Sequence, residues 1–419
     1  MAAATCPDCG TVLPTHTDWV TWCSACNWNV NTVREERSRT RLERLDDHIA
    51  ARLGDRLAAR VKATDDLRPR LTASTAAAYA IAACVQIAAV AVVLVAVGIA
   101  VRTFPNVFAL VVAAAMVGFA WLIRPRYGKQ PTKCRLERTD APGLYGLAER
   151  VAAALETEPP DIVVLDDTVN AYWSVVTLRR RRVLAIGLPL LAVLDPSERV
   201  ALIAHEVAHG RNGDVRRGLF VSSALNTLAE VYRLLVPGES ALTYTDLGIV
   251  DQVTRAVTWI LARPVGWLYT LEIRLLLYDM QRAEYLADSL AAKVAGRDAV
   301  VALHEKLLLE PVIRHAVQRA THDRTDPGSV CDVVAASVRG VPELERERRR
   351  RVAALERTRR EATHPPTAMR IDVLESRAPT SPLVVLGDDE SRAIDAELAP
   401  QRSRLGQALV DRYRESLYR

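Results

Sequence analysis

The sequence predicts an α+β fold, in which a small antiparallel sheet of short strands is followed by a helix-rich remainder. Apolar runs of strand length, bounded by turn residues, occur between positions 162 and 187. A helix start at 195–198 then opens the helical part. A cysteine-rich start and two long uncharged runs come first. We therefore expect a small metal-binding module and a membrane hairpin ahead of the α+β domain.

Composition excludes two broad classes of protein. Half of the 419 residues are apolar and a quarter are charged, which fits neither a disordered chain nor a simple all-membrane channel. The net charge is +5, and the arginines gather beside the apolar runs and in one late segment. We expect a membrane surface, and no nucleic acid, as the partner of these charges. Lysine is scarce beside arginine, which suggests a GC-rich bacterial genome.

Two CxxC pairs stand close together at the N-terminus. The first pair is Cys6 and Cys9, the second is Cys23 and Cys26, and 13 residues separate them. Each pair offers two thiolates from one tight turn, which suits tetrahedral zinc, and a redox role is the alternative. A module of residues 1–32 is too small to fold around a core alone, so we predict a zinc ribbon. The other cysteines are isolated, which favours a reducing compartment.

Residues 33–70 are strongly charged, with apolar residues at helical spacing, namely Leu42, Leu45, Ile49, Leu53 and Leu57. The pattern predicts a helix that is a solvated spacer, and the alternatives are a helix that lies on the protein or one that pairs with a second copy of itself. Further charged helices are expected over 346–360 and from Asp389, the latter within a helical tail over 376–419. We interpret both as solvated faces rather than binding sites.

Residues 71–124 contain two uncharged runs, 71–101 and 103–123, with Arg102 between them. Each run exceeds the roughly 20 residues that cross the hydrocarbon core, so two transmembrane helices are predicted. A buried hairpin of a soluble protein is the alternative. Arginines flank both outer ends, so the positive-inside rule places both termini and the following domain in the cytoplasm of a multi-pass cell-membrane protein. The first 18 residues lack the features of a cleavable signal peptide.

The chemistry is expected in a domain over residues 125–375, on the helix that bears His205, Glu206 and His209. Residues four apart share one helical face, so both imidazoles can bind one metal ion. Glu206 lies one residue further round and can take a proton from a water that the metal activates. The alternative is a helix that carries two histidines by chance.

A catalytic zinc ion needs a third protein ligand and an open position. Glu284 is the candidate, because Asp288 follows one turn later on the same helical face. One carboxylate can bind the metal while the other orients a ligating imidazole. Asp214 is another candidate for that orienting role. An ordinary exposed acidic pair is the alternative for Glu284 and Asp288.

Several short motifs resemble elements of the HtpX and CAAX prenyl protease family. Residues 205–214 are similar to its HExxH-x-x-NGD element, 284–288 to its ExxAD element and 364–371 to its HPPxxxRI element. Asn170 and Ala171 fit the family's pattern before a strand. The resemblance runs from about residue 124 to residue 374 and includes the preceding membrane hairpin.

The resemblance implies a gluzincin metallopeptidase, in which His205, His209 and Glu284 bind zinc and Glu206 is the catalytic base. It also implies that His364 lies near the cleft and stabilises an oxyanion, whereas a packing or capping histidine is the alternative. Two zinc ions are then expected per chain, one catalytic and one structural.

The chain departs from the family pattern in two places. The zinc ribbon and the charged spacer are additions. Some members carry a second membrane hairpin where this chain has residues 219–236 and 256–278, which contain charges. Because charges inside a membrane are costly, we expect amphipathic helices that cover the site or rest on the membrane surface.

The predicted function is hydrolysis of peptide bonds in membrane or misfolded proteins by a membrane-anchored zinc endopeptidase. Residues 183–187 directly precede the helix with the metal ligands, so we expect them to bind extended substrate as an edge strand. The alternative comes from another class: a membrane-bound signalling or scaffold protein that uses a peptidase-like fold to bind one specific partner.

Overall fold

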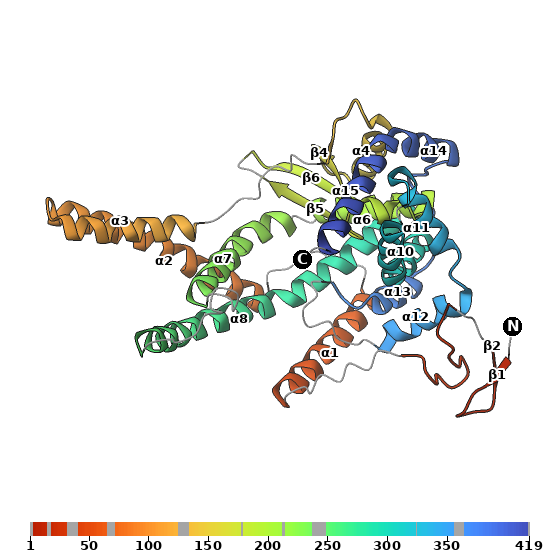
Figure 1. The fold of residues 1–419 in the computed structure, drawn as a ribbon, viewed down its shortest axis with the longest axis horizontal. Helices are drawn as coiled ribbons and strands as arrows, with labels where there is room; N and C mark the ends of the chain where they lie inside the picture. The colour runs from red at the N-terminus through yellow and green to blue at the C-terminus, as the bar shows by residue number, and fades with distance from the viewer. Residues whose placement is uncertain are drawn as a thin grey trace. The chain divides into compact units, whose positions relative to one another are not determined.

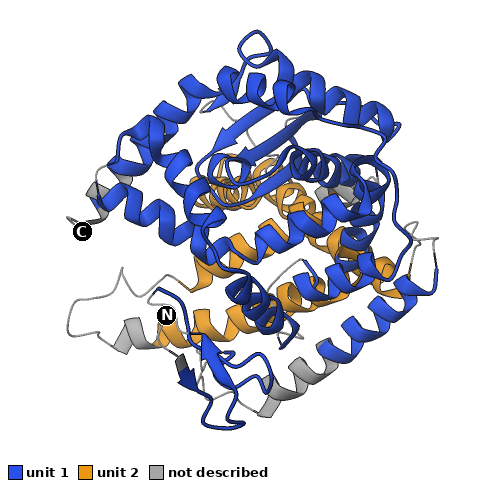
Figure 2. Ribbon diagram, turned by 90° about the vertical axis from the view of Figure 1, so that its right-hand side faces the viewer, with its two compact units in different colours: residues 1–68, 130–212, 281–419 blue, residues 69–129, 213–280 orange. Residues whose placement is uncertain are grey.

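The computed structural model describes residues 3–14, 18–31, 41–64, 72–124, 134–176, 179–211, 214–236, 249–323, 325–355 and 364–417 (Figure 1). The chain forms two compact units, coloured separately in Figure 2. Unit 1 comprises residues 1–68, 130–212 and 281–419, and unit 2 comprises residues 69–129 and 213–280. Each unit is described on its own below.

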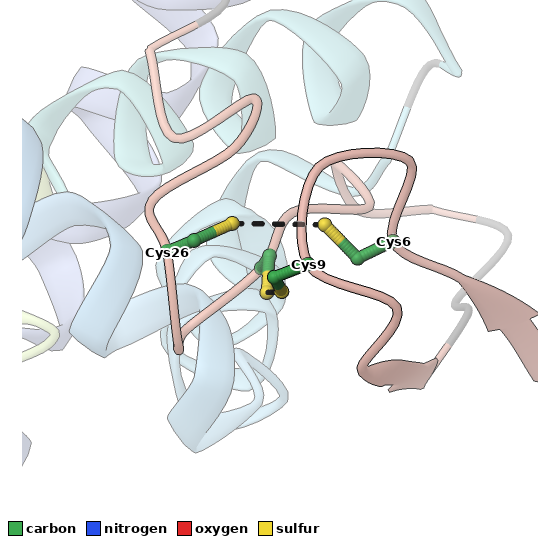
Figure 3. A group of neighbouring side chains, drawn as sticks. Cys6, Cys9 and Cys26 are labelled. Carbon is green, nitrogen blue, oxygen red and sulfur yellow. Dashed lines mark hydrogen bonds between the residues drawn. The ribbon is translucent and has the colours of Figure 1, made fainter.

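The N-terminal module of unit 1 folds around its cysteines. Strands β1 (Ala3–Thr5) and β2 (Val12–Pro14) pair antiparallel. Between them Gly10 takes a positive φ of 72°, a conformation that glycine adopts without strain, and this closes the first CxxC turn. Figure 3 shows the cysteine side chains facing one another across the module. A small cluster in its interior is formed by buried Cys6, Leu13 and Cys23 with the partly buried Trp28, and Trp22 and Val30 are also buried.

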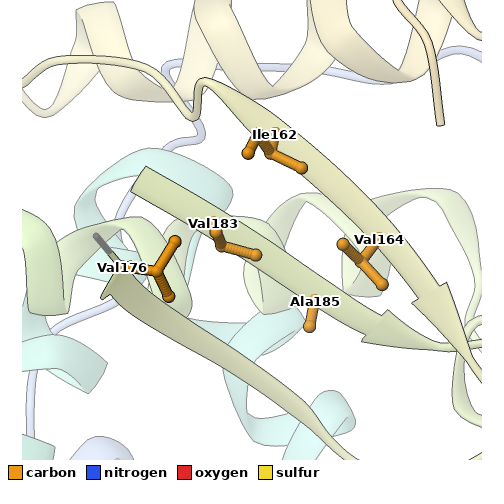
Figure 4. Close-up of a cluster of buried hydrophobic side chains, with 5 residues drawn as sticks. All are labelled: Ile162, Val164, Val176, Val183 and Ala185. Atoms are coloured by element: carbon orange, nitrogen blue, oxygen red, sulfur yellow. The ribbon is translucent and has the colours of Figure 1, made fainter. Parts of the chain in front are cut away.

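A four-stranded sheet with the order β3-β4-β6-β5 is the second feature of unit 1. Its strands are β3 (Arg135–Leu136), β4 (Ile162–Asp166), β5 (Ala171–Val176) and β6 (Arg181–Gly187). β4 and β6 run parallel, and the other neighbours are antiparallel. A cluster of buried aliphatic side chains packs along these strands (Figure 4): Ile162, Val164, Val176, Val183 and Ala185. The predicted α+β class is confirmed, with one parallel pair inside an otherwise antiparallel sheet.

β6 lies inside the sheet, so the prediction that residues 183–187 form an edge strand is wrong. Its residues Val183 to Ile186 are at most 1% exposed. The uninterrupted apolar run explains this position, because a strand covered on both faces needs no polar alternation. β5 is an edge strand instead, since β6 is its only partner among the described strands, and β3 lies at the opposite edge.

Helices make up the rest of unit 1. They are α1 (Arg41–Lys62), α4 (Pro142–Ala154), α5 (Leu188–Leu191), α6 (Pro196–Arg211), α9 (Arg297–Leu307), α10 (Glu310–His322), the 3-10 turn Pro327–Ser329, α11 (Val330–Arg339), α12 (Glu343–Leu355), α13 (Thr367–Glu375), α14 (Asp388–Glu397) and α15 (Ala399–Leu417). The long helix α8 (Ile249–Ala295) contributes its residues from 281 onward.

The second half of α1 packs within unit 1 and is not a solvated spacer. Leu57 and Val61 are each 1% exposed. Lys62 Nζ lies 2.5 Å from Asp372 Oδ2 on α13, and Arg377 donates a hydrogen bond to the Val61 carbonyl at 3.1 Å. The remaining parts of the predicted spacer, residues 32–40 and 65–71, lie outside the described residues.

Unit 2 contains α2 (Ala73–Thr103), α3 (Val107–Leu122), α7 (Asp214–Leu235) and the first part of α8. The Thr72 hydroxyl caps α2 by accepting the N–H of Thr75 at 3.1 Å, and Asn106 caps α3 in the same way. Among the described residues, α2 is the one helix long and apolar enough to cross a membrane, with 31 residues and a mean hydropathy of 2.8 in its central window. α3 has 16 residues, fewer than the predicted run.

Inside unit 2, α2 packs against α7. Ala82 and Ala224 are fully buried between these helices, and Gln86 donates to the Ser223 hydroxyl at 2.9 Å. Large apolar side chains are exposed on α7 and α8, namely Phe220, Tyr232, Trp259, Ile260 and Trp267, whereas Glu272 is fully buried. The prediction that residues 219–236 and 256–278 rest on the membrane or cover the site stays a prediction.

Candidate metal centre

Helix α6 begins where the sequence predicts and carries its histidines into the interior. Pro196 is its first residue, and Glu198 Oε2 accepts the N–H of Asp195 at 2.8 Å. Burial raises the pKa of Glu198, and Lys306 Nζ lies 3.2 Å from the same oxygen. Small side chains let α6 pack closely against α4 and α9, and three of them are fully buried: Ala201, Ala204 and Ala208.

The structure brings together His205, His209 and Glu284, which come from α6 and α8. His205 Nε2 lies 3.4 Å from His209 Nε2 and 3.4 Å from Glu284 Oε2. His209 Nε2 lies 3.5 Å from Glu284 Oε1. Ligand atoms about 2.0–2.1 Å from a tetrahedral zinc ion stand about 3.3 Å apart, so these three groups fit zinc without rearrangement.

Asp288 lies one turn after Glu284, as predicted, and contacts the first histidine. Its Oδ1 is 3.1 Å from His205 Nδ1. When Nδ1–H of His205 donates to this carboxylate, the lone pair of Nε2 faces the other two ligands. Although burial alone would raise it, the charge of Arg370 and the hydrogen bonds from the imidazoles hold the pKa of Asp288 well below its usual range.

Arg370 on α13 is part of this cluster rather than a remote structural residue. Its Nε donates to Asp288 Oδ2 at 2.8 Å and its Nη2 to Oδ1 at 2.6 Å, which is a bidentate pair. Its Nη1 lies 3.3 Å from Glu284 Oε2. One buried guanidinium therefore contacts both Glu284, which is one of the three metal-binding groups, and Asp288, which orients His205.

His304 on α9 is a member of the cluster that the sequence analysis missed. Its Nε2 lies 3.0 Å from Asp288 Oδ1, and the residue is 1% exposed. Burial and the neighbouring Arg370 lower the pKa of His304, which favours the neutral ring. No local sequence pattern identifies His304, because Gly296 separates α8 from α9. Only the tertiary packing of α9 brings His304 next to Asp288.

Glu206 and His364 border one cavity of about 680 Å³ beside the three metal-binding groups. Glu206 is 7% exposed, while the side chain of His364 is 53% exposed. His364 Nδ1 lies 2.8 Å from Glu284 Oε2, so it stands next to the predicted third ligand. The start of β5 reaches the same cavity through Asn170 and Ala171. The two predicted catalytic residues thus share a space that a substrate can enter.

The second group of possible metal ligands is formed by Cys6, Cys9, Cys23 and Cys26. Cys6 Sγ lies 3.6 Å from Cys26 Sγ, and Cys9 Sγ lies 3.5 Å from Cys23 Sγ. Sulfur atoms about 2.3 Å from a tetrahedral zinc ion stand about 3.8 Å apart, so the four thiols fit zinc closely. All four cysteines are free, and these spacings exceed the roughly 2.05 Å of a disulfide bond.

One predicted site residue is left without a structural account. Residues 212–213 of the NGD element lie outside the described residues, as does the side chain of Asp214 at the start of α7. Its predicted orienting role stays a prediction. Asp288 supplies such a contact to His205.

Comparison with known proteins identifies the family. The model of peptidase family M48 matches residues 141–378, more than half of the chain. The chain belongs to peptidase family M48. The matched segment contains the three metal-binding groups, Glu206 and His364, and the resemblance predicted from the motifs is confirmed. It includes neither the cysteine module nor α2 and α3.

Curated relatives support the same assignment. Protease HtpX of Xanthomonas euvesicatoria pv. vesicatoria is 28% identical over 169 residues, which cover 40% of this chain and 56% of the relative. Protease HtpX homolog 1 of Saccharolobus solfataricus is 33% identical over 120 residues, 28% of this chain and 38% of that protein. Protease HtpX of Aeromonas hydrophila subsp. hydrophila is 23% identical over 221 residues, 48% of this chain and 74% of that protein. The chain thus spans about half the length of the first of these relatives.

Proposed function

We propose that this M48 family member is a membrane-anchored zinc endopeptidase that hydrolyses membrane or misfolded proteins. The observation that carries the proposal is the spacing of 3.4–3.5 Å among the binding atoms of His205, His209 and Glu284, beside a cavity that Glu206 borders. The family match favours this function over the scaffold alternative. We propose that the protein binds one zinc ion in this centre and one in the cysteine module.

Bound zinc would polarise the substrate carbonyl and the attacking water, which lowers the pKa of that water towards neutrality. Glu206 accepts the proton that the water releases as its oxygen attacks the peptide carbonyl carbon. The same carboxyl group then delivers the proton to the amine when the C–N bond breaks. His364 borders the cavity and can donate a hydrogen bond to the developing oxyanion. Asp288 keeps His205 in the tautomer that leaves Nε2 free.

β5 is the strand best placed to bind an extended substrate. It is one of the two outer strands of the sheet, and its first residue Ala171 borders the cavity together with the preceding Asn170. An added strand would pair with its open edge, so main-chain hydrogen bonds would bring a peptide towards the metal centre. Recognition through the backbone suits a protease that cuts many unfolded sequences.

The proposed topology puts residues 1–70 and 125–419 in the cytoplasm, on either side of a hairpin formed by α2 and α3. Arginine-rich flanks at both outer ends motivate this orientation. Cysteine labelling of intact cells from outside should reach a probe at Asn106, in the turn of the hairpin. Probes at Asp18 and Arg346 should stay unlabelled, and labelling of either would overturn the orientation.

Metal removal and restoration test the proposed activity. The purified full chain in detergent should hydrolyse an unfolded protein substrate, lose this activity on chelation and regain it with zinc. Absence of hydrolysis in protein that holds zinc in the His2Glu centre would contradict the proposed function.

Self-association through residues 33–70 is a separate proposal. Chemical cross-linking of the same sample tests it.

A further inference from the structure

Helix α12 is partly buried, whereas the sequence analysis predicted a charged helix exposed to solvent. Glu345 is 3% exposed and Arg348 is 8% exposed. Arg348 and Glu345 form a bidentate ion pair at 2.6 and 2.8 Å, and Arg349 donates to the same carboxylate at 2.9 Å. The charged side of the helix therefore packs against the rest of unit 1, and its ion pairs are buried.

The same face of α12 forms part of the wall of the cavity at the metal centre. Four of its residues border that cavity together with Glu206 and His364: Arg348, Arg349, Val352 and Ala353. Their spacing of three to four residues places them along one side of the helix. A movement of α12 would therefore change the shape of the proposed substrate cleft.

The cysteine module is fastened to α12 by two arginines. Arg348 Nη1 donates to the Val30 carbonyl at 2.8 Å, and this contact is buried. Arg351 Nη1 donates to the Ser24 carbonyl at 2.5 Å and to Asn27 Oδ1 at 2.8 Å. The guanidinium of Arg351 also lies over the ring of Trp22, 5.1 Å from its centroid.

These contacts depend on the shape of the second CxxC turn. Ser24 lies between Cys23 and Cys26, and Asn27 follows Cys26 with a left-handed φ of 63°. The module has few buried apolar side chains, so the four thiolates must be held together for the turn to keep this shape. The module also lines the cavity directly, through Asn31 at its C-terminal end.

We propose that the cysteine module helps to shape the substrate cleft by holding α12 in place. Arg348 and Arg351 are the positioning residues, because they join α12, which forms part of the cleft wall, to the module. This inference rests on the proposed function, because it takes the cavity to be the place where substrate binds. Loss of metal from the module frees α12 and weakens substrate binding. The chemistry at the other centre continues, because α12 supplies none of its ligands.

The first test compares Arg351 on α12 with an arginine that lies outside α12. Arg351→Gln should raise KM roughly three- to tenfold, the factor that one or two net hydrogen bonds carry, and leave kcat close to that of the unaltered protein. Arg392→Gln is the control, because Arg392 pairs with Asp389 within its own helix α14 and the side chain of Asp389 is 97% exposed. An equal KM in both variants and the unaltered protein would overturn the proposal.

The second test removes a thiolate and does not depend on hydrolysis. Cys26→Ser should lower bound zinc by about one ion per chain and speed amide hydrogen exchange across residues 343–355. Cys134→Ser is the control, because Cys134 is exposed and lies outside the cluster. Unchanged exchange in α12 after loss of the module's zinc would overturn the proposal. If α12 loosens while the unaltered protein hydrolyses nothing, the proposed function fails and the coupling of module to helix stands.

Discussion

The two candidate metal centres are built in opposite ways. Glu284 of the His2Glu centre is 5% exposed, and its helix also bears Asp288, which ties it to Arg370 and His304. In the cysteine centre Cys9 and Cys26 are exposed, and the surrounding core is small. The first centre is held by packed helices and buried ion pairs, the second by two short turns.

This difference predicts a catalytic role for a metal in the His2Glu centre and a structural role for one in the cysteine centre. In the His2Glu centre the protein fixes the ligands before metal binds, which leaves the metal free to do chemistry. In the cysteine centre a bound metal would supply much of the folding free energy, so its presence would decide the shape of the module. Removing metal should therefore abolish activity at one centre and loosen structure at the other.

The largest expected effect follows from removal of the third ligand. Glu284→Ala should lose the zinc of the His2Glu centre and bring hydrolysis to background, because two imidazoles alone bind zinc weakly. The cysteine centre should keep its ion, so elemental analysis should find about one zinc per chain. Loss of both ions would show that the two centres are not independent.

A smaller effect is expected at the carboxylate that orients His205. Asp288→Asn should weaken zinc binding about 10- to 100-fold, the usual cost of losing such a partner. It should also destabilise the fold by about 3 kcal/mol, because buried Arg370 loses its bidentate ion pair and keeps only the contact with Glu284. Zinc titration and denaturant unfolding measure the two quantities. Asp372→Asn is the control, because the side chain of Asp372 is 69% exposed and should contribute little. Equal zinc affinity in the two variants would contradict this role.

How far the sequence predicts this site depends on how local each signal is. His205, His209 and Glu206 were predictable because a helix fixes their spacing, and Glu284 with Asp288 for the same reason. The contacts of His304 and Arg370 with Asp288 bring three helices together, and no local pattern encodes that packing. The resemblance to the HtpX and CAAX prenyl protease family depended on whole motifs in the right order, and short-range periodicity does not supply that information.

Two errors in the predicted fold have the same origin. A run of apolar residues predicted the strand at 183–187 but not its neighbours, and the order of the sheet placed it inside. A run of charges predicted the helix at 346–360 but also suggested full exposure. Arg348 and Glu345 are buried because they neutralise each other and because Arg348 reaches the Val30 carbonyl more than 300 residues earlier in the chain. Residues 356–360 lie outside the described residues.

The smallest expected effect on the chemistry comes from deletion of the cysteine module. A chain without residues 1–31 should bind one zinc ion fewer and keep its kcat, while its KM rises. The reason is that the module borders the cavity but provides no ligand to the His2Glu centre. Elemental analysis and steady-state kinetics on the same preparation measure both. A fall of kcat to background with the other zinc ion retained would contradict the division of roles.

The most direct test of the central claim is substitution of Glu206, the proposed base beside the His2Glu centre. Glu206→Gln keeps the shape of the side chain and leaves His205, His209 and Glu284 unaltered, but the amide cannot accept the proton of the attacking water. We predict that the variant binds about two zinc ions per chain and unfolds like the unaltered protein, while its kcat falls at least about 100-fold. Hydrolysis at the unaltered rate, with both zinc ions in place, would show that Glu206 is not the base and would contradict the account.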